Sequence, residues 1–298
     1  MSGDESSRNG GAPLPRISFS LVGFVKSPER PNGTWFDPCP ETHAKDNDLA
    51  MCAKYSARKL IRFHQTGGPH VLRIDEVPPS EPGENEVVVR VRAMGLSRID
   101  VLWREDGYVE DPVFPAQIGY DAAGTVEAVG AKVVGFNVGD RVSTFPAVSL
   151  LDYGAHGDVI LYPDHALLLY PANLSPIEAA AVNTALFTGY FALVELANLQ
   201  AGQFVVVTAP SSSTGIAALQ LARKIGAKTI ALTRSAGKVS ELIAAGAGHV
   251  LVLGDCDVRR AIVDITDGLG ADVVYDAVAG PGLEELVWAT KQLGQVIV

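Results

Sequence analysis

The stretch "QFVVVTAPSSSTGIAALQLARKIG" at residues 203–226 decides the fold. Its apolar run at 204–207 predicts a buried strand, its serine-rich centre predicts a loop, and the apolar spacing that follows predicts a helix. Strand, loop and helix in this order are typical of a unit with parallel strands.

The same rhythm continues toward the C-terminus. Predicted strands and helices alternate through "KTIALT", "KVSELIAAG", "HVLVL", "VRRAIVDITDG", "ADVVYDA", "GLEELVWATKQ" and "GQVIV". The strands are too apolar for a half-exposed sheet, so we expect an α/β fold, a doubly wound Rossmann sheet with helices on both faces. Five such strands precede Val298, whereas a six-stranded sheet needs more.

The N-terminal side differs in character. Short β-rich runs such as "NEVVVRVRAMGL" and "DAAGTVEAVG" predict a mostly β domain, interrupted by a short helix that Ser97 could cap. Ser175, Pro176 and Glu178 form a capping box that opens the next helical stretch. We therefore divide the chain into an N-terminal extension (1–54) that we expect to be disordered, a substrate domain (55–175) and a dinucleotide-binding domain (176–298).

The composition of the chain excludes several classes of binding partner. The 298 residues carry a net charge of −10, which disfavours nucleic acid and anionic lipid, and no run approaches the ~20 apolar residues of a membrane span. The opening residues lack a basic leader, and the three cysteines form neither a disulfide framework nor a metal knuckle. We expect a cytoplasmic protein that acts on a small molecule.

The loop after the first α/β strand is the predicted phosphate site. Aligned on Gly215, the pattern G-x-G-x-x-G is replaced by Pro210, Ser211, Ser212, Ser213, Thr214 and Gly215, so two of its three glycines are missing. The loop, with Ala209 before it, still leads into a helix N-terminus, which suits a pyrophosphate. An ordinary serine-rich loop is the alternative.

The end of the second strand indicates which dinucleotide would bind. A site for NAD places an acid here, but this chain has Thr233, Arg234, Ser235 and Lys238. Two cations and two hydroxyls suit a 2′-phosphate, which predicts NADP(H). A solvated turn with a basic edge is the alternative.

These motifs carry a family resemblance. "GLSRID" at 95–100, "IGYDAAGTVEAVG" at 118–130, "GDRV" at 139–142 and "NTALFTGYFAL" at 183–193 precede the phosphate loop in the order found in medium-chain dehydrogenases/reductases. The sequence resembles the zinc-free quinone oxidoreductase branch, the zeta-crystallin-like proteins. The resemblance implies a GroES-like substrate domain followed by a Rossmann domain.

The positions of the family's zinc ligands are informative. Ser97, Tyr120 and Thr184 stand where the zinc branch has Cys, His and Cys. Hydroxyl groups cannot replace thiolate or imidazole on Zn²⁺, so no metal site is expected. Without a Lewis acid the acceptor must already be electrophilic, such as a quinone or an α,β-unsaturated carbonyl.

The resemblance also implies roles for single residues. Ser97 and Tyr108 would position the acceptor or donate a hydrogen bond to it, Thr188 would lie near the nicotinamide, and Ala277 and Val278 would pass beneath the cofactor. Tyr108 could instead be a loop aromatic, and Thr188 a packing residue. Leu253 stands where relatives often have a tyrosine near the adenine, so adenine stacking could be lost.

Three functional hypotheses remain open. The first is an NADPH-dependent reductase of quinones or enones, which family resemblance implies to be a homodimer. The second is a catalytically silent NADP(H)-binding protein, and the third is a reductase module of a larger synthase. Family members continue beyond the strand at "GQVIV", so we expect a C-terminally truncated Rossmann domain with an exposed sheet edge and reduced activity.

Overall fold

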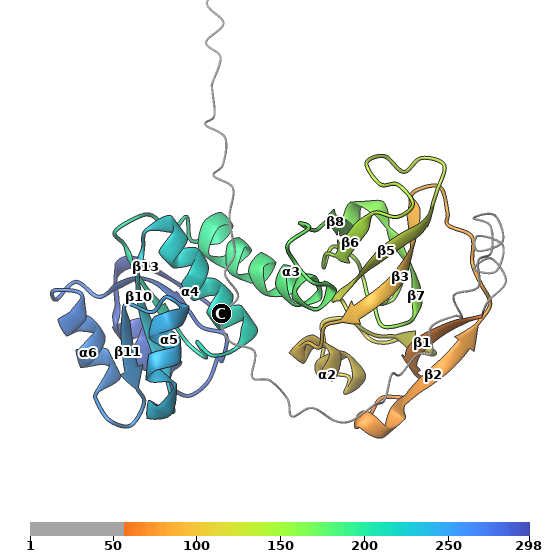
Figure 1. Ribbon diagram of the computed structural model, residues 1–298. Helices are drawn as coiled ribbons and strands as arrows, with labels where there is room; N and C mark the ends of the chain where they lie inside the picture. The colour runs from red at the N-terminus through yellow and green to blue at the C-terminus, as the bar shows by residue number, and fades with distance from the viewer. Residues whose placement is uncertain (1–56) are drawn as a thin grey trace, which may run out of the picture.

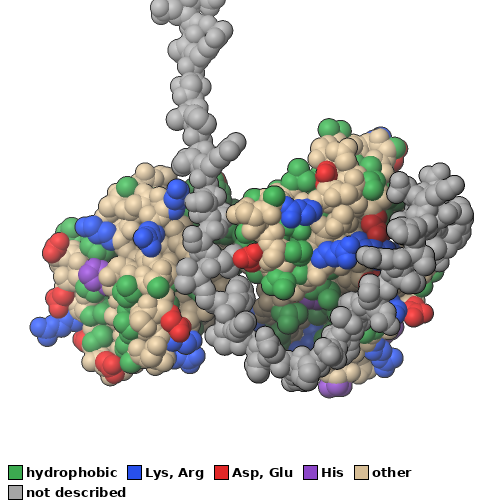
Figure 2. All heavy atoms as spheres, viewed as in Figure 1, with side chains coloured by type: hydrophobic (Ala, Val, Ile, Leu, Met, Phe, Trp, Pro, Cys, Tyr) green, Lys and Arg blue, Asp and Glu red, His purple; other side chains and the backbone are tan. Residues whose placement is uncertain are grey.

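The computed structural model describes residues 57–298, so the predicted extension at 1–54 lies outside the described residues. Two lobes are joined by the long helix α3 (Pro176–Tyr190), which runs from one lobe to the other in Figure 1. On the face seen in Figure 2, acidic and basic side chains are interspersed over both lobes.

The first lobe is mostly β-sheet, as predicted. Its elements are β1 (Arg58–Phe63), η1 (Pro69–Val71), β2 (Leu72–Val77), β3 (Glu86–Met94), α2 (Arg98–Arg104), β4 (Ala116–Gln117), β5 (Ala122–Val129), β6 (Arg141–Thr144), β7 (Val159–Pro163), η2 (Asp164–Ala166) and β8 (Leu167–Leu169). They form sheets of order β2-β1-β4 and β7-β3-β5-β6-β8. Both sheets are antiparallel, and Val87, Val89 and Tyr162 of the five-stranded sheet share one buried core cluster with Leu60 of β1.

The second lobe is the predicted α/β unit. After α3 come η3 (Phe191–Leu196), β9 (Phe204–Val207), α4 (Ser213–Ile225), β10 (Lys228–Thr233), η4 (Ala236–Lys238), α5 (Val239–Ala245), β11 (His249–Val252), α6 (Val258–Ile265), β12 (Ala271–Tyr275), α7 (Leu283–Trp288) and β13 (Thr290–Ile297). The strands are parallel and ordered β11-β10-β9-β12-β13. The Rossmann prediction is confirmed, including its five strands.

Strand β9 shows why the sheet needs helices on both faces. Val205 and Val207 are buried with Leu219 of α4 on one face, whereas Val206 is buried with Ile262 of α6 on the other. Because successive side chains of a strand point to opposite faces, an unbroken apolar run must be covered twice.

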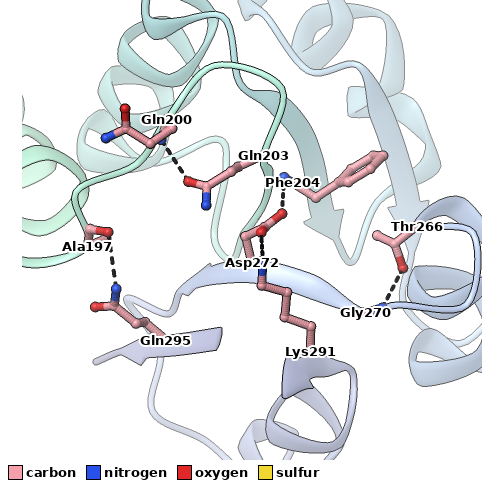
Figure 3. Close-up of polar contacts among 9 residues, drawn as sticks. All are labelled: Ala197, Gln200, Gln203, Phe204, Thr266, Gly270, Asp272, Lys291 and Gln295. Carbon is pink, nitrogen blue, oxygen red and sulfur yellow. Dashed lines mark hydrogen bonds and ion pairs between the residues drawn. The ribbon is translucent and has the colours of Figure 1, made fainter. Parts of the chain in front are cut away.

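Polar contacts fasten the amino ends of these strands (Figure 3). The backbone N–H of Phe204 donates to Asp272 Oδ2 at 2.7 Å, and Asp272 also pairs with Lys291. Gln295 Nε2 donates to the carbonyl of Ala197 at 3.1 Å, which ties β13 to the end of η3. The opposite, carboxyl ends of these strands border a cavity.

Helix α3 and its π-helical continuation η3 connect the two cores. Ser175 and Glu178 form the predicted capping box at the start of α3. Ala180 packs near Ala123 of the first lobe, and Leu193 is buried in the core of the second. By length and composition alone, 176–196 is the one segment within 57–298 that could cross a membrane, but its buried residues serve two protein cores.

Candidate cofactor and acceptor site

A cavity of about 580 Å³ opens at the carboxyl ends of the parallel strands. It gathers eight of the residues predicted to bind cofactor, namely Ala209, Ser211, Ser212, Thr233, Arg234, Ser235, Lys238 and Val278. This edge of an open α/β sheet is where ligands bind when strand order reverses, as it does beside β9.

The segment leading into α4 has one glycine, Gly215, where the dinucleotide-binding pattern has three. Ser212 caps the helix, because its hydroxyl accepts from the N–H of Gly215 at 3.0 Å. A Cβ at position 215 would lie 2.4 Å from the carbonyl oxygen of Ala209, so only glycine fits there. Ala209 itself adopts a left-handed conformation with φ of 41°, which an L-residue rarely adopts. The one retained glycine is therefore the one that packing requires.

The basic cluster at the end of β10 lies on the rim of this cavity. Arg234 and Lys238 are exposed, and no carboxylate pairs with either of them within 57–298. Lys238 Nζ donates to Ser211 Oγ at 2.9 Å, which links the two predicted phosphate-binding segments across the cavity. Because no carboxylate neutralises them, both cations can pair with an anion.

Asp276 is a cavity residue that sequence reasoning missed. It is 3% exposed, and its Oδ1 accepts from Thr208 Oγ1 at 2.6 Å and from the N–H of Val278 at 3.0 Å. These bonds tie the end of β9 to the end of β12, the strands that flank the cavity. An acid directly after an apolar strand was the available signal.

The remaining predicted cofactor residues do not line the cavity. Four of them are neighbours in sequence of residues that do line it: Ser213, Thr214, Gly215 and Ala277. The fifth, Thr188, is on α3, where its hydroxyl donates to the carbonyl of Thr184 at 2.8 Å. Leu253 lines the cavity and supplies an apolar contact without an aromatic ring.

The acceptor-side predictions fall on the first lobe. Ser97 caps α2, and its hydroxyl accepts from the N–H of Ile99 at 3.4 Å. Tyr108 is half-buried against Trp103, and its hydroxyl lies 3.5 Å from that of Tyr120. Burial raises the pKa of Tyr120, and the hydrogen bond with Tyr108 raises it further, so this hydroxyl stays protonated.

Thr184 joins α3 to a buried carboxyl group of the first lobe. Its hydroxyl donates to Asp121 Oδ1 at 2.6 Å. Burial raises the pKa of Asp121, and the bond from Thr184 partly opposes that rise. Nearby, His156 Nε2 donates to the carbonyl of Gly95 at 2.8 Å.

A second buried carboxyl group, that of Asp100, lies close enough to Asp121 to affect its pKa. Burial raises the pKa of Asp100, whose Oδ1 has no hydrogen-bond partner within 57–298. Within 57–298, no group of three or more His, Cys, Asp or Glu side chains is placed to hold a metal.

Two lobes with a dinucleotide-type cavity define the class of two-domain dehydrogenases and reductases.

Comparison with known proteins identifies the family within that class. Residues 83–168 match the alcohol dehydrogenase GroES-like domain, and residues 213–298 match the zinc-binding dehydrogenase domain. Quinone oxidoreductase 1 of Escherichia coli is 34% identical over 237 residues, which cover 80% of this chain and 71% of that protein. The Pseudomonas aeruginosa quinone oxidoreductase is 34% identical over 220 residues, covering 74% of this chain and 66% of the relative.

Solved structures agree with this placement. The Escherichia coli quinone oxidoreductase complexed with NADPH superimposes with a TM-score of 0.72 at 31% identity, covering 80% of this chain and 72% of that one. The CurF ER cyclopropanase of curacin A biosynthesis gives 0.71 at 26% identity, covering 80% of this chain and 73% of that one. The chain belongs to the quinone oxidoreductases of the medium-chain dehydrogenase/reductase family, which are oxidoreductase enzymes.

Proposed function

We propose that this protein is an NADPH-dependent reductase that transfers hydride to a quinone or an α,β-unsaturated carbonyl without zinc. The observation that carries the proposal is the exposed pair Arg234 and Lys238 on the cavity rim, with no acidic partner within 57–298. A relative complexed with NADPH supports the same cofactor.

The chain has groups suited to the pyrophosphate and to the 2′-phosphate of the cofactor. The N-terminus of α4 and the Ser211–Ser212 loop would bind the pyrophosphate through backbone N–H groups and hydroxyls. Arg234 and Lys238 would bind the 2′-phosphate through charge-assisted hydrogen bonds. NADPH, when bound, supplies a hydride from its nicotinamide ring.

The acceptor would be held by hydroxyl groups. Ser97, Tyr120 and Thr184 stand where the zinc branch of the family has its metal ligands, so in a zinc-free mechanism polarisation of the acceptor carbonyl has to come from hydrogen bonds. Tyr108 is the more accessible member of the tyrosine pair and can donate to the oxygen on which negative charge develops. Quinones and enones suit this arrangement because they accept hydride at carbon without a Lewis acid.

Two further expectations belong to this proposal. The scarcity of cysteine fits a cytoplasmic location, and the family resemblance fits a homodimer. Sedimentation of the purified chain measures the second directly.

The direct experiment is NADPH oxidation with a panel of quinones and enones, with zinc added or removed by a chelator. We expect turnover of at least one electrophilic acceptor and no change on chelation. Tight NADPH binding without turnover of any acceptor would support a silent NADP(H)-binding protein instead. Loss of turnover on chelation would overturn the zinc-free mechanism.

A further inference from the structure

We propose that a second cavity of the α/β lobe, at the amino ends of β10 and β11, binds the phosphate group of a small phosphorylated metabolite. This cavity has a volume of about 390 Å³, and Arg223, Lys228 and His249 line it. It shares no residue with the cofactor cavity, so the inference does not depend on the proposed reductase activity.

The two cavities lie at opposite ends of the same strand. Strand β10 begins at Lys228, which lines the second cavity, and ends at Thr233, which lines the cofactor cavity. Each strand residue advances the chain by about 3.3 Å, so the two ends of β10 lie roughly 17 Å apart. A ligand in the second cavity can therefore be bound together with a dinucleotide.

The charged side chains around the second cavity are all cationic or neutral. Arg223, Lys228 and His249 are exposed, and within 57–298 no carboxylate lines the cavity or pairs with any of the three. Lys228 Nζ lies 4.7 Å from the centroid of the Phe204 ring. An aromatic face positions an ammonium group without cancelling its charge. The cavity is thus a basic site in a chain whose net charge is −10.

The ends of two helices are the alternative partners of these cations. Arg223 lies in the last turn of α4, and α5 ends at Ala245, next to the loop that borders the cavity. A helix C-terminus carries about half a negative charge, so the two ends together supply roughly one. Arg223 and Lys228 supply two permanent positive charges. A positive surplus therefore remains for a ligand.

The turn at residues 246–248 forms one side of the cavity and is held rigidly. Thr229 Oγ1 donates to the carbonyl of Gly246 and accepts from the N–H of Gly248, each at 2.8 Å. The N–H groups of Gly246 and Ala247 donate to carbonyls of α5. Because every N–H of this turn already has a partner, an anion has to be held by side chains.

Gly246 brings the arginine side chain close to this turn. Its φ of 120° is a conformation that favours glycine. A Cβ built at this position would lie 3.4 Å from Arg223 Cδ, so the apolar stem of the arginine packs against the turn. Packing of the stem orients the guanidinium group before any ligand arrives.

The kinds of donor indicate a phosphate ester. A phosphate monoester carries about −1.5 to −2 charges and three acceptor oxygens, which match the fork of Arg223 and the ammonium group of Lys228. The cavity volume falls within the roughly 300–1,000 Å³ of small-molecule sites, which leaves room for an organic group beside the phosphate. Ile243 lines the cavity and is 47% exposed, so it offers this group an apolar contact.

The test is a calorimetric titration of the full chain with ribose 5-phosphate at about 0.15 M salt, which screens distant charges. We expect saturable binding, and we expect Arg223→Ala and Lys228→Ala each to raise the dissociation constant at least about 10-fold. Lys224→Ala is the matched control, because Lys224 is an exposed cation of the same last turn but does not line the cavity. It should change the dissociation constant less than about 2-fold.

Three outcomes of these titrations would overturn the site. The first is that the unaltered chain does not bind ribose 5-phosphate. The second is an equal loss in Lys224→Ala, which would indicate general attraction to the basic helix end. The third is loss of binding in Arg234→Ala but not in Arg223→Ala, which would place the phosphate in the cofactor cavity. If one of the two cavity variants fails to fold, the other still decides.

Further probes distinguish a phosphate ester from other anions. Inorganic phosphate should bind about 5-fold more weakly than ribose 5-phosphate, and ribose should not bind. Equal affinity for inorganic phosphate, or for the dicarboxylate succinate, would overturn the assignment to a phosphate ester. None of these measurements needs turnover, so failure of the reductase proposal does not affect their outcome.

Discussion

The two sides of the site are built in opposite ways. On the cofactor side, exposed side chains such as Arg234 and Lys238 come from one short segment and have no acidic partners within 57–298. On the acceptor side, Asp121 and Thr184 are buried, lie far apart in the sequence and already bind each other at 2.6 Å. Cofactor binding should therefore respond to surface charge, whereas acceptor reduction should respond to packing.

The largest effect should come from the core beneath the acceptor side. Trp103 is fully buried, and its Nε1 donates to the carbonyl of Gln117 at 2.8 Å. We expect Trp103→Ala to lower the free energy of unfolding by about 4 kcal/mol, because it leaves a cavity and an unpaired carbonyl. Urea unfolding measures this. Trp288→Ala, at a side chain that is 62% exposed in the cofactor lobe, is the control and should change stability little.

A cofactor-side change should leave stability alone and alter binding. Arg234→Ala should raise the dissociation constant for NADPH about 10- to 100-fold and leave that for NADH nearly unchanged, since only NADPH carries the 2′-phosphate. A fluorescence titration with both nucleotides checks this. Lys224→Ala, which removes an exposed cation near the other end of α4, is the matched control. Equal loss for both nucleotides would contradict the 2′-phosphate assignment.

A third prediction uses the buried carboxyl group of the acceptor side. Burial raises the pKa of Asp121 above its ordinary 3.8, so the folded chain holds this proton more tightly than the unfolded chain. Its contribution to the free energy of unfolding therefore falls as the pH rises from the unfolded to the folded pKa, and is constant above that. Asp121→Asn keeps an acceptor for Thr184 but does not ionise.

The corresponding measurement is urea unfolding across a series of pH values. The variant should gain stability relative to the unaltered chain as the pH rises through that window. Asp100 and His156, which share the region, remain in both proteins and do not create the difference. Asp111→Asn, at an exposed carboxylate of the same lobe, is the control. Parallel curves for Asp121→Asn and the unaltered chain would rule out a buried ionisation at this site.

The smallest expected effects on stability come from the two serines that cap helices α2 and α4. Ser97→Ala and Ser212→Ala each remove an N-cap and should each cost about 1 kcal/mol. Ser97→Ala should also lower kcat for the acceptor, whereas Ser212→Ala should weaken NADPH binding. Stopped-flow hydride transfer and nucleotide titration distinguish these outcomes, and the reverse pattern would contradict our assignment of the two sides.

The cofactor side was predictable because its information is local. Strand, loop and helix follow each other in the sequence, and the cations at the end of β10 needed no knowledge of distant residues. The left-handed Ala209 was not predictable, because alanine gives no sign of that conformation.

Contacts between residues that lie far apart in the sequence could not be predicted in this way. Asp276 meets Thr208 across 68 positions, and Thr184 meets Asp121 across 63. From the sequence, Thr184 could be identified only as a position where a zinc ligand is replaced by a hydroxyl. Its actual contact with Asp121 depends on how α3 lies against the first lobe.

Helix α3 also restricts how the length of this protein can vary. Thr184 must meet Asp121 in one lobe while Leu193 fills the core of the other, and both lie on one continuous helical segment. One inserted or deleted residue between them would rotate the far end by about 100°. Either the polar contact or the core packing would then be lost. Surface loops tolerate such changes. The segment from 184 to 193, in contrast, is expected to tolerate neither insertions nor deletions.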